Sequence, residues 1–74
     1  MIRTWSETVQ ITVNGQNETL DESATVSDLL ARFELAPLRV AIEVNEQLVR
    51  RADYGETTLR AGDRVEIVTL VGGG

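Results

Sequence analysis

The sequence contains no cysteine, no histidine and no lysine. Without cysteine or histidine, a disulfide is impossible and the usual ligand sets for zinc, haem and iron–sulfur clusters are missing. A chain of 74 residues also lies near the lower size limit for independent folding. We therefore predict a single domain over residues 1–74 that holds no metal and depends on well-patterned secondary structure for its stability.

The same absences argue against a stand-alone enzyme. The three serines have neither a histidine nor a lysine to serve as base, which excludes a self-contained nucleophilic triad. Two pairs of neighbouring carboxylates remain as acid–base candidates, Asp21 with Glu22 and Glu43 with Glu46. A chain this short can hardly build the apolar cleft that such a pair needs. We therefore predict that the protein is not an enzyme, that it has no catalytic residue, and that these carboxylates are solvated surface charges.

Charge and hydropathy limit the partners. Twelve acidic residues against seven arginines give a net charge of −5, whereas nucleic-acid binding rewards a basic patch. No run approaches the roughly 18 apolar residues of a membrane span, and the N-terminal MIRTWSE lacks the apolar core of a signal peptide. These observations predict a cytoplasmic protein that binds neither nucleic acid nor membrane.

The first elements are predicted to form a hairpin. Residues 8–14, TVQITVN, alternate apolar and polar side chains, which is typical of a half-buried strand. Asn14 and Gly15 both tolerate the positive φ angles of a type I′ turn. Residues 16–21 are polar apart from Leu20 and therefore predict a returning edge strand.

A helix follows this hairpin. Thr25 and Asp28 have the spacing of a capping box, and Pro37 prevents the helix from continuing. The apolar positions at helical spacing form one stripe that is expected to pack on the sheet: Val26, Leu29, Leu30 and Phe33.

The pattern in the second half of the sequence predicts further strands. Residues 39–45 alternate so that Val40, Ile42 and Val44 face inward, and residues 47–49 form a short strand after a turn. Leu59 is the single apolar anchor of the irregular stretch that follows.

The last strand is predicted over residues 64–71, RVEIVTLV. The alternation places Val65 and Ile67 on the inner face, and it carries Val68 and Leu70 onto the outer face. These two outward residues are our candidates for docking a partner.

The order of these elements predicts the β-grasp arrangement, an α+β fold. In this fold a mixed sheet of four to five strands has one helix packed across one face. The first and last strands, the most apolar ones, should lie side by side at its centre. Residues 1–7 form an N-terminal extension and residues 72–74 a flexible glycine tail.

The chain ends in three glycines directly after its last strand. A merely frayed end would leave the composition unconstrained. Three residues without Cβ atoms instead form a thin thread that carries the terminal carboxylate roughly 10 Å beyond Val71. Such an end could pass through a narrow channel and present its carboxylate to a nucleotide for activation.

The stretches ITVNGQ, ATVSDLL, VAIEVN and TLRAGDRVEIVTLVGGG together resemble the ThiS family of sulfur carriers, which are ubiquitin-like β-grasp proteins of thiamine biosynthesis. The resemblance covers most of the chain from Val9 onward, and its final stretch is the most specific.

The resemblance implies a carrier cycle. A ubiquitin-activating-type (ThiF-like) enzyme would use ATP to adenylate the carboxylate of Gly74, with Gly72 and Gly73 as the threading residues. A persulfide charged by a cysteine desulfurase would convert the adenylate to a thiocarboxylate, and a ThiG-like thiazole synthase would take the sulfur. The carrier itself would bind no cofactor.

Three alternatives remain open from the sequence. The small subunit of molybdopterin synthase is a similar carrier, but its members have a Phe-Pro-Pro-type stretch where this chain has IVTLV. A sulfur carrier for tRNA thiolation is harder to exclude. A β-grasp module that only binds a partner would not need the terminal glycines.

Overall fold

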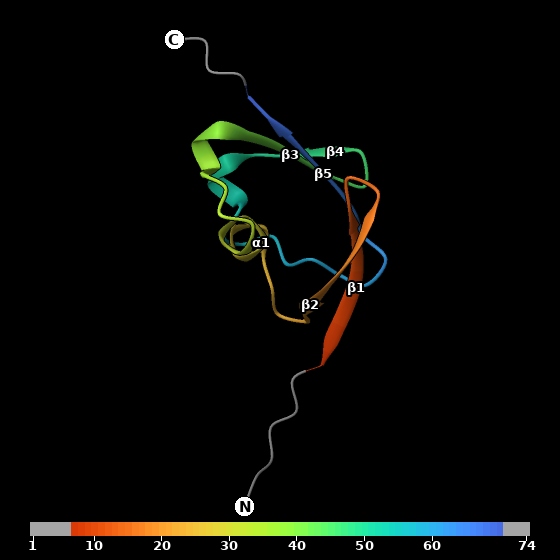
Figure 1. The fold of residues 1–74 in the computed structure, drawn as a ribbon. Helices are drawn as coiled ribbons and strands as arrows, with labels where there is room; N and C mark the ends of the chain where they lie inside the picture. The colour runs from red at the N-terminus through yellow and green to blue at the C-terminus, as the bar shows by residue number, and fades with distance from the viewer. Residues whose placement is uncertain (1–6, 71–74) are drawn as a thin grey trace, which may run out of the picture.

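One mixed sheet organises the chain in the computed structural model, which describes residues 7–70 (Figure 1). The strand order is β2-β1-β5-β3-β4; β1 and β5 pair in parallel and all other neighbours pair antiparallel. The elements in chain order are β1 (Thr8–Val13), β2 (Gln16–Asp21), α1 (Val26–Arg32), η1 (Pro37–Arg39), β3 (Val40–Val44), β4 (Gln47–Val49), η2 (Arg51–Asp53) and β5 (Arg64–Thr69). The predicted α+β class is confirmed, and so is the contact between the first and last strands.

The β1–β2 hairpin closes at the predicted turn. Asn14 and Gly15 have φ values of 50° and 84°. This conformation is open to glycine and tolerated by asparagine, while most side chains resist it. The pairing runs from Val13 opposite Gln16 to Thr8 opposite Asp21. The turn chemistry predicted from two residues therefore sets the register of the whole hairpin.

Helix α1 begins at the predicted capping box. The Thr25 hydroxyl accepts a hydrogen bond from the Asp28 backbone N–H at 3.2 Å, and the Thr25 N–H donates to the Asp28 carboxylate at 2.9 Å. These reciprocal bonds satisfy two backbone donors that would otherwise be orphaned at the helix start. Sequence and structure agree at this end of the helix.

The other end of α1 lies before Pro37, as predicted, at a position that the sequence left unspecified. The helix stops at Arg32, so Phe33 is its C-cap rather than its last turn, although Phe33 still packs against the core. Glu34 has a φ of 59°, and its N–H donates to the carbonyl of Ala31, while the Leu35 N–H donates to the carbonyl of Leu30. This is a Schellman ending built on a glutamate, where glycine is usual. It ends the helix well before Pro37.

The core fills the space between α1 and one face of the sheet. The residues predicted to face inward are buried or partly buried. Leu59 is buried as expected, but it is not the single anchor of its region, because Tyr54 at the end of η2 is also only 4% exposed. The buried side chains are Ile11, Val13, Leu20, Ala24, Val26, Leu29, Leu30, Val40, Ile42, Tyr54, Leu59 and Val65.

Strand β5 ends at Thr69, earlier than the predicted limit of residue 71, which lies outside the described residues. The Leu70 N–H still donates to the carbonyl of Arg39 at 2.7 Å, so the pairing with the β3 side persists one residue further. Within residues 7–70, no helix has the length and apolar character needed to cross a bilayer.

Candidate functional site

The central strand β5 leads directly to the predicted reactive end of the chain. It is flanked by β1 on one side and by β3 on the other. The predicted adenylation site, Gly74, and the predicted threading residues, Gly72 and Gly73, lie outside the described residues. The structure therefore describes the strand that precedes the tail and the surfaces beside that strand.

The outer face of β5 is apolar near its C-terminal end. Val68 is 57% exposed and Leu70 is 46% exposed, which confirms the outward orientation predicted from the alternation. Ala41 on β3 lies directly opposite Val68 and is half-buried. Whether these side chains dock a partner stays a prediction.

The outer face holds one further apolar side chain that the sequence analysis missed. Leu48 in the short strand β4 is 69% exposed. It lies opposite Glu43, which in turn lies opposite Glu66 on β5. Paired positions share a face of the sheet, so Leu48 belongs to the same face as Val68. Only the strand register reveals this, since β4 and β5 are not adjacent in the sequence.

Two carboxylates oppose each other on this face. Glu43 and Glu66 are paired across β3 and β5, and both are exposed. Like charges directly opposite one another on neighbouring strands are unfavourable. Neither of them takes part in the two ion pairs found within residues 7–70, Arg32 with Glu18 and Arg64 with Glu46.

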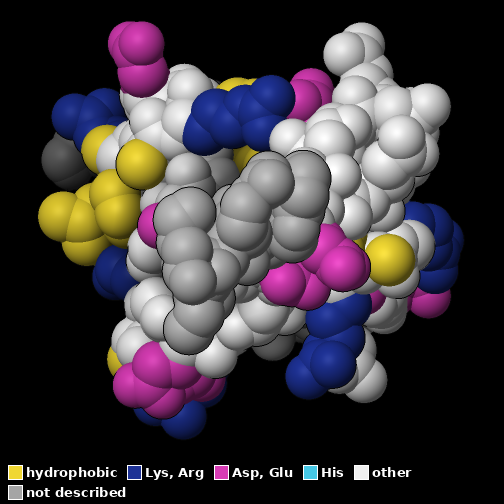
Figure 2. All heavy atoms as spheres, turned by 90° about the horizontal axis from the view of Figure 1, so that it is seen from below, with side chains coloured by type: hydrophobic (Ala, Val, Ile, Leu, Met, Phe, Trp, Pro, Cys, Tyr) yellow, Lys and Arg dark blue, Asp and Glu magenta, His cyan; other side chains and the backbone are white. Residues whose placement is uncertain are grey.

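Charges of both signs are spread over other parts of the surface. Figure 2 shows the molecule from below, where acidic and basic side chains are interspersed with small groups of hydrophobic ones. No single-sign basic field dominates this view.

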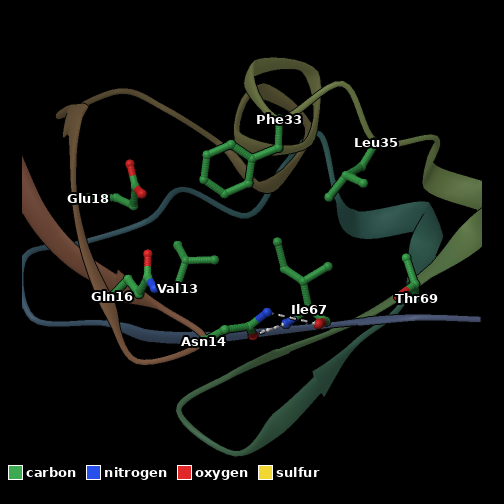
Figure 3. Close-up of a pocket in the computed structure, with 8 residues that line it drawn as sticks. All are labelled: Val13, Asn14, Gln16, Glu18, Phe33, Leu35, Ile67 and Thr69. Carbon is green, nitrogen blue, oxygen red and sulfur yellow. Dashed lines mark hydrogen bonds between the residues drawn. The ribbon is translucent and has the colours of Figure 1, made fainter.

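A pocket of about 380 Å³ lies on the inner side, between the end of α1 and the sheet (Figure 3). Phe33 and Leu35 form one wall, and Ile67 lies across from them. It contains no thiol, imidazole or amine, and its one carboxylate, Glu18, pairs with Arg32 at 3.5 Å. The pocket lining is mixed, with apolar side chains on one wall and the polar groups of Asn14, Gln16 and Thr69 beside them. Its lining residues are Val13, Asn14, Gln16, Glu18, Phe33, Leu35, Ile67 and Thr69.

The Asn14 side chain ties β5 to the hairpin turn. Its amide oxygen accepts from the Ile67 N–H at 2.8 Å, and its amide nitrogen donates to the Ile67 carbonyl at 3.2 Å. The backbone N–H of Asn14 donates to the carbonyl of Val65 at 2.9 Å. The side-chain amide thus continues the parallel ladder after β1 has turned away. The sequence marks Asn14 as a turn residue and carries no sign of this second role.

The sequence and the fold are similar to those of known proteins. The family model described as the ThiS family matches residues 5–74. The sulfur carrier protein ThiS of Bacillus subtilis (strain 168) is 38% identical over 53 residues, covering 72% of this chain and 80% of its own length. The crystal structure of a thiamine biosynthesis protein (ThiS) from Geobacter metallireducens superposes with a TM-score of 0.75 at 36% identity, covering 89% of this chain and all of that one.

A longer relative matches as well. A thiazole synthase of Magnetococcus marinus is 35% identical over 66 residues, which cover 89% of this chain. The match takes up 20% of that synthase. The chain thus spans about a fifth of the length of this relative, which contains a segment similar to it.

The assignment of β5 residues to an inner and an outer face can be tested by replacing valine with threonine, once at a buried position and once at an exposed one. Val65→Thr places a hydroxyl in the core and should lower the free energy of unfolding by about 1–3 kcal/mol. Val68→Thr changes an exposed residue and should alter it by no more than about 0.5 kcal/mol. Urea denaturation of both variants measures the difference. Equal losses at the two positions would contradict the assignment of Val68 to the outer face.

Proposed function

The chain belongs to the ThiS family, and we propose that it acts as a sulfur carrier in thiamine biosynthesis. The observation that carries this proposal is the family match over residues 5–74, which includes the terminal glycines. The β-grasp sheet and the similarity to the Bacillus and Geobacter proteins support it. The protein would then be a substrate of enzymes rather than an enzyme.

The chemistry begins with the carboxylate of Gly74. This group is ionised at neutral pH and is therefore a poor electrophile. A ThiF-like enzyme joins it to the AMP moiety of ATP and releases pyrophosphate, which provides the acyl carbon with a leaving group. A persulfide attacks that carbon and displaces AMP, forming an acyl disulfide. A thiol then cleaves the S–S bond, leaving a thiocarboxylate on Gly74 and a disulfide on the donor side.

The composition supports this assignment of roles. Because the chain has no cysteine, sulfur cannot be carried on a side-chain thiol, and the terminal carboxyl group is the available position. Gly72 and Gly73 have no Cβ, so the end can enter a channel too narrow for other residues. The cysteine desulfurase would supply the sulfur indirectly, through the persulfide. ATP would be bound by the adenylating enzyme, and the carrier would hold no cofactor.

The outer face of β5 supports a docking role for Val68 and Leu70. Both are exposed apolar residues at the base of the tail, so a partner that holds the tail would also reach them. The opposed carboxylates Glu43 and Glu66 would favour a partner that brings a basic group to this face. We assign this surface to the adenylating enzyme.

A thiazole synthase is the proposed acceptor of the sulfur. A relative of that name contains a segment similar to this chain within its own sequence, which would hold carrier and synthase together. Where the two are separate chains, the thiocarboxylate would have to be delivered by binding. A cytoplasmic location would bring the carrier, the desulfurase and both enzymes together.

The decisive experiment is intact-mass spectrometry of the protein after incubation with the cognate adenylating enzyme, ATP and a persulfide donor. We expect a fraction in which one oxygen is replaced by sulfur, and tandem fragmentation should locate it at Gly74. A variant with one alanine added after Gly74 is the control, and it should stay unloaded if the thiocarboxylate forms at a terminal glycine. If the natural chain gains no sulfur while an authentic carrier does so under the same conditions, the carrier proposal is wrong.

Gly73→Ala tests the threading role of the tail. The added methyl group should obstruct a narrow channel and lower the rate of adenylation by at least about tenfold, which corresponds to about 1.4 kcal/mol of transition-state binding. Pyrophosphate release measures that rate. The denaturation midpoint should not change, because the position lies beyond the last strand. Normal adenylation of this variant would argue against a narrow channel.

The docking surface can be tested apart from the tail. The double variant Val68→Thr/Leu70→Thr removes the exposed apolar groups and should weaken binding to the adenylating enzyme by about tenfold or more, since a few central apolar residues usually dominate such interfaces. Calorimetric titration measures the dissociation constant. Leu38→Thr is the matched control, because Leu38 is 69% exposed but lies in η1, outside the sheet. Equal effects of the double variant and the control would refute the assignment.

A further inference from the structure

Strand β5 carries the proposed docking residues beyond the point where its parallel neighbour ends. The β1–β5 register stops at Val13 opposite Val65, and β1 then turns away at Asn14. Figure 1 shows β5 continuing past this turn toward the C-terminus. Beyond Val65, no strand of the described chain pairs with β5 on this side, while β3 pairs with it as far as Thr69. The part of β5 that contains Val68 therefore has a neighbouring strand on one side only.

The side-chain amide of Asn14 takes the place of a neighbouring strand at Ile67. Its oxygen accepts a hydrogen bond from the Ile67 N–H at 2.8 Å, and its nitrogen donates to the Ile67 carbonyl at 3.2 Å (Figure 3). A primary amide offers both a donor and an acceptor, as a peptide group does. Both backbone groups of Ile67 are thus bonded on the β1 side, one residue before Val68.

A second asparagine bonds to β5 in a similar way at the other end of the strand. Asn45 begins the turn between β3 and β4 with a φ of 53°, close to the 50° of Asn14. Its backbone N–H donates to the Arg64 carbonyl at 2.7 Å, and its amide oxygen accepts from the Arg64 N–H at 2.9 Å. Both asparagines are exposed, and both have a backbone conformation that glycine adopts more readily. They differ in place, because Asn45 bonds to the first residue of β5 and Asn14 bonds near its end.

This difference in place matters for docking. A partner that binds Val68 and Leu70 needs both side chains in one arrangement, and ordering a strand end on binding costs conformational entropy. Asn14 removes part of that cost in advance, because its two bonds fix the backbone of Ile67 beside Val68. The reacting carboxylate belongs to Gly74, further along the sequence. The bonds therefore act on binding of the carrier, and the chemical step does not depend on them.

We propose that Asn14 is a positioning residue for the adenylation reaction, which keeps the end of β5 in the arrangement that the adenylating enzyme binds. It acts through Ile67, whose backbone it fixes next to the docking residue Val68. The inference rests on the proposed function, because the enzyme is the one assigned to the outer face of β5. It goes beyond that function by giving a residue of the hairpin turn a share in recognition of the carrier.

Asn14→Gly tests the inference, with Asn45→Gly as the matched control. Glycine accepts the positive φ at both positions, so both turns are kept, and each substitution removes a side-chain amide that bonds to β5. Adenylation is followed by pyrophosphate release with the carrier as the varied substrate. The temperature is chosen so that circular dichroism shows both variants to be fully folded. A loss of stability alone cannot change KM under these conditions.

We expect Asn14→Gly to raise KM about fivefold or more and to keep kcat within about twofold of the wild type, because the backbone at Ile67 must then be ordered on binding. Asn45→Gly should leave both constants within about twofold of the wild type. Equal KM values for the two variants overturn the inference alone, and so does a loss of kcat without a change in KM. If the wild-type chain is not adenylated, the proposed function fails and the inference fails with it.

Hydrogen exchange gives a second measurement that requires neither the enzyme nor a folded variant. In the free wild-type protein, the Ile67 amide should exchange at least about tenfold more slowly than in an unstructured peptide, since the Asn14 oxygen accepts its hydrogen bond. In Asn14→Gly, this protection should fall about tenfold or more. Exchange of the wild-type Ile67 amide at the rate of an unstructured peptide overturns the inference, whatever the kinetic constants are.

Discussion

The parallel pairing of β1 with β5 is the contact on which the rest of the structure depends. It joins the N-terminal hairpin to the half of the sheet that contains β3 and β4, and there is no other strand pairing between these halves in the described chain. Its register holds two residue pairs, extended by the Asn14 amide on Ile67 across 53 positions of sequence. Closing so long a loop costs chain entropy, which Val13, Val65 and the helix above them offset by burial.

This pairing also prepares the protein for its proposed role. Because β5 is central, its first part pairs with β1 on one side and with β3 on the other. The segment that precedes the terminal glycines therefore follows a strand that is paired on both sides at its start. Helix α1 covers the inner face, and Val68 and Leu70 on the outer face are exposed among residues 7–70. A small domain without disulfides thus separates the surface that stabilises it from the surface available to enzymes.

Much of the fold could be predicted because its determinants are local. The alternation around Ile11, Ile42 and Val65 identified the strands, and Asn14-Gly15 identified the hairpin turn. What the sequence left open or predicted wrongly has the same kind of explanation. The exact end of α1 depends on Glu34 adopting a positive φ, for which a glutamate gives no compositional signal. Tyr54 lies in a polar stretch, and its burial depends on the elements that pack around it.

The sequence by itself determined the elements, the apolar face of each, and the glycine end on which the carrier chemistry would take place. These features follow from residues a few positions apart, or from chemical groups that are simply present or absent. Tertiary structure decided that Leu48 shares a face with Val68 and that the Asn14 amide bonds to Ile67. Such relations require the register between distant strands, because a shift of one residue would turn every side chain of a strand to the opposite face.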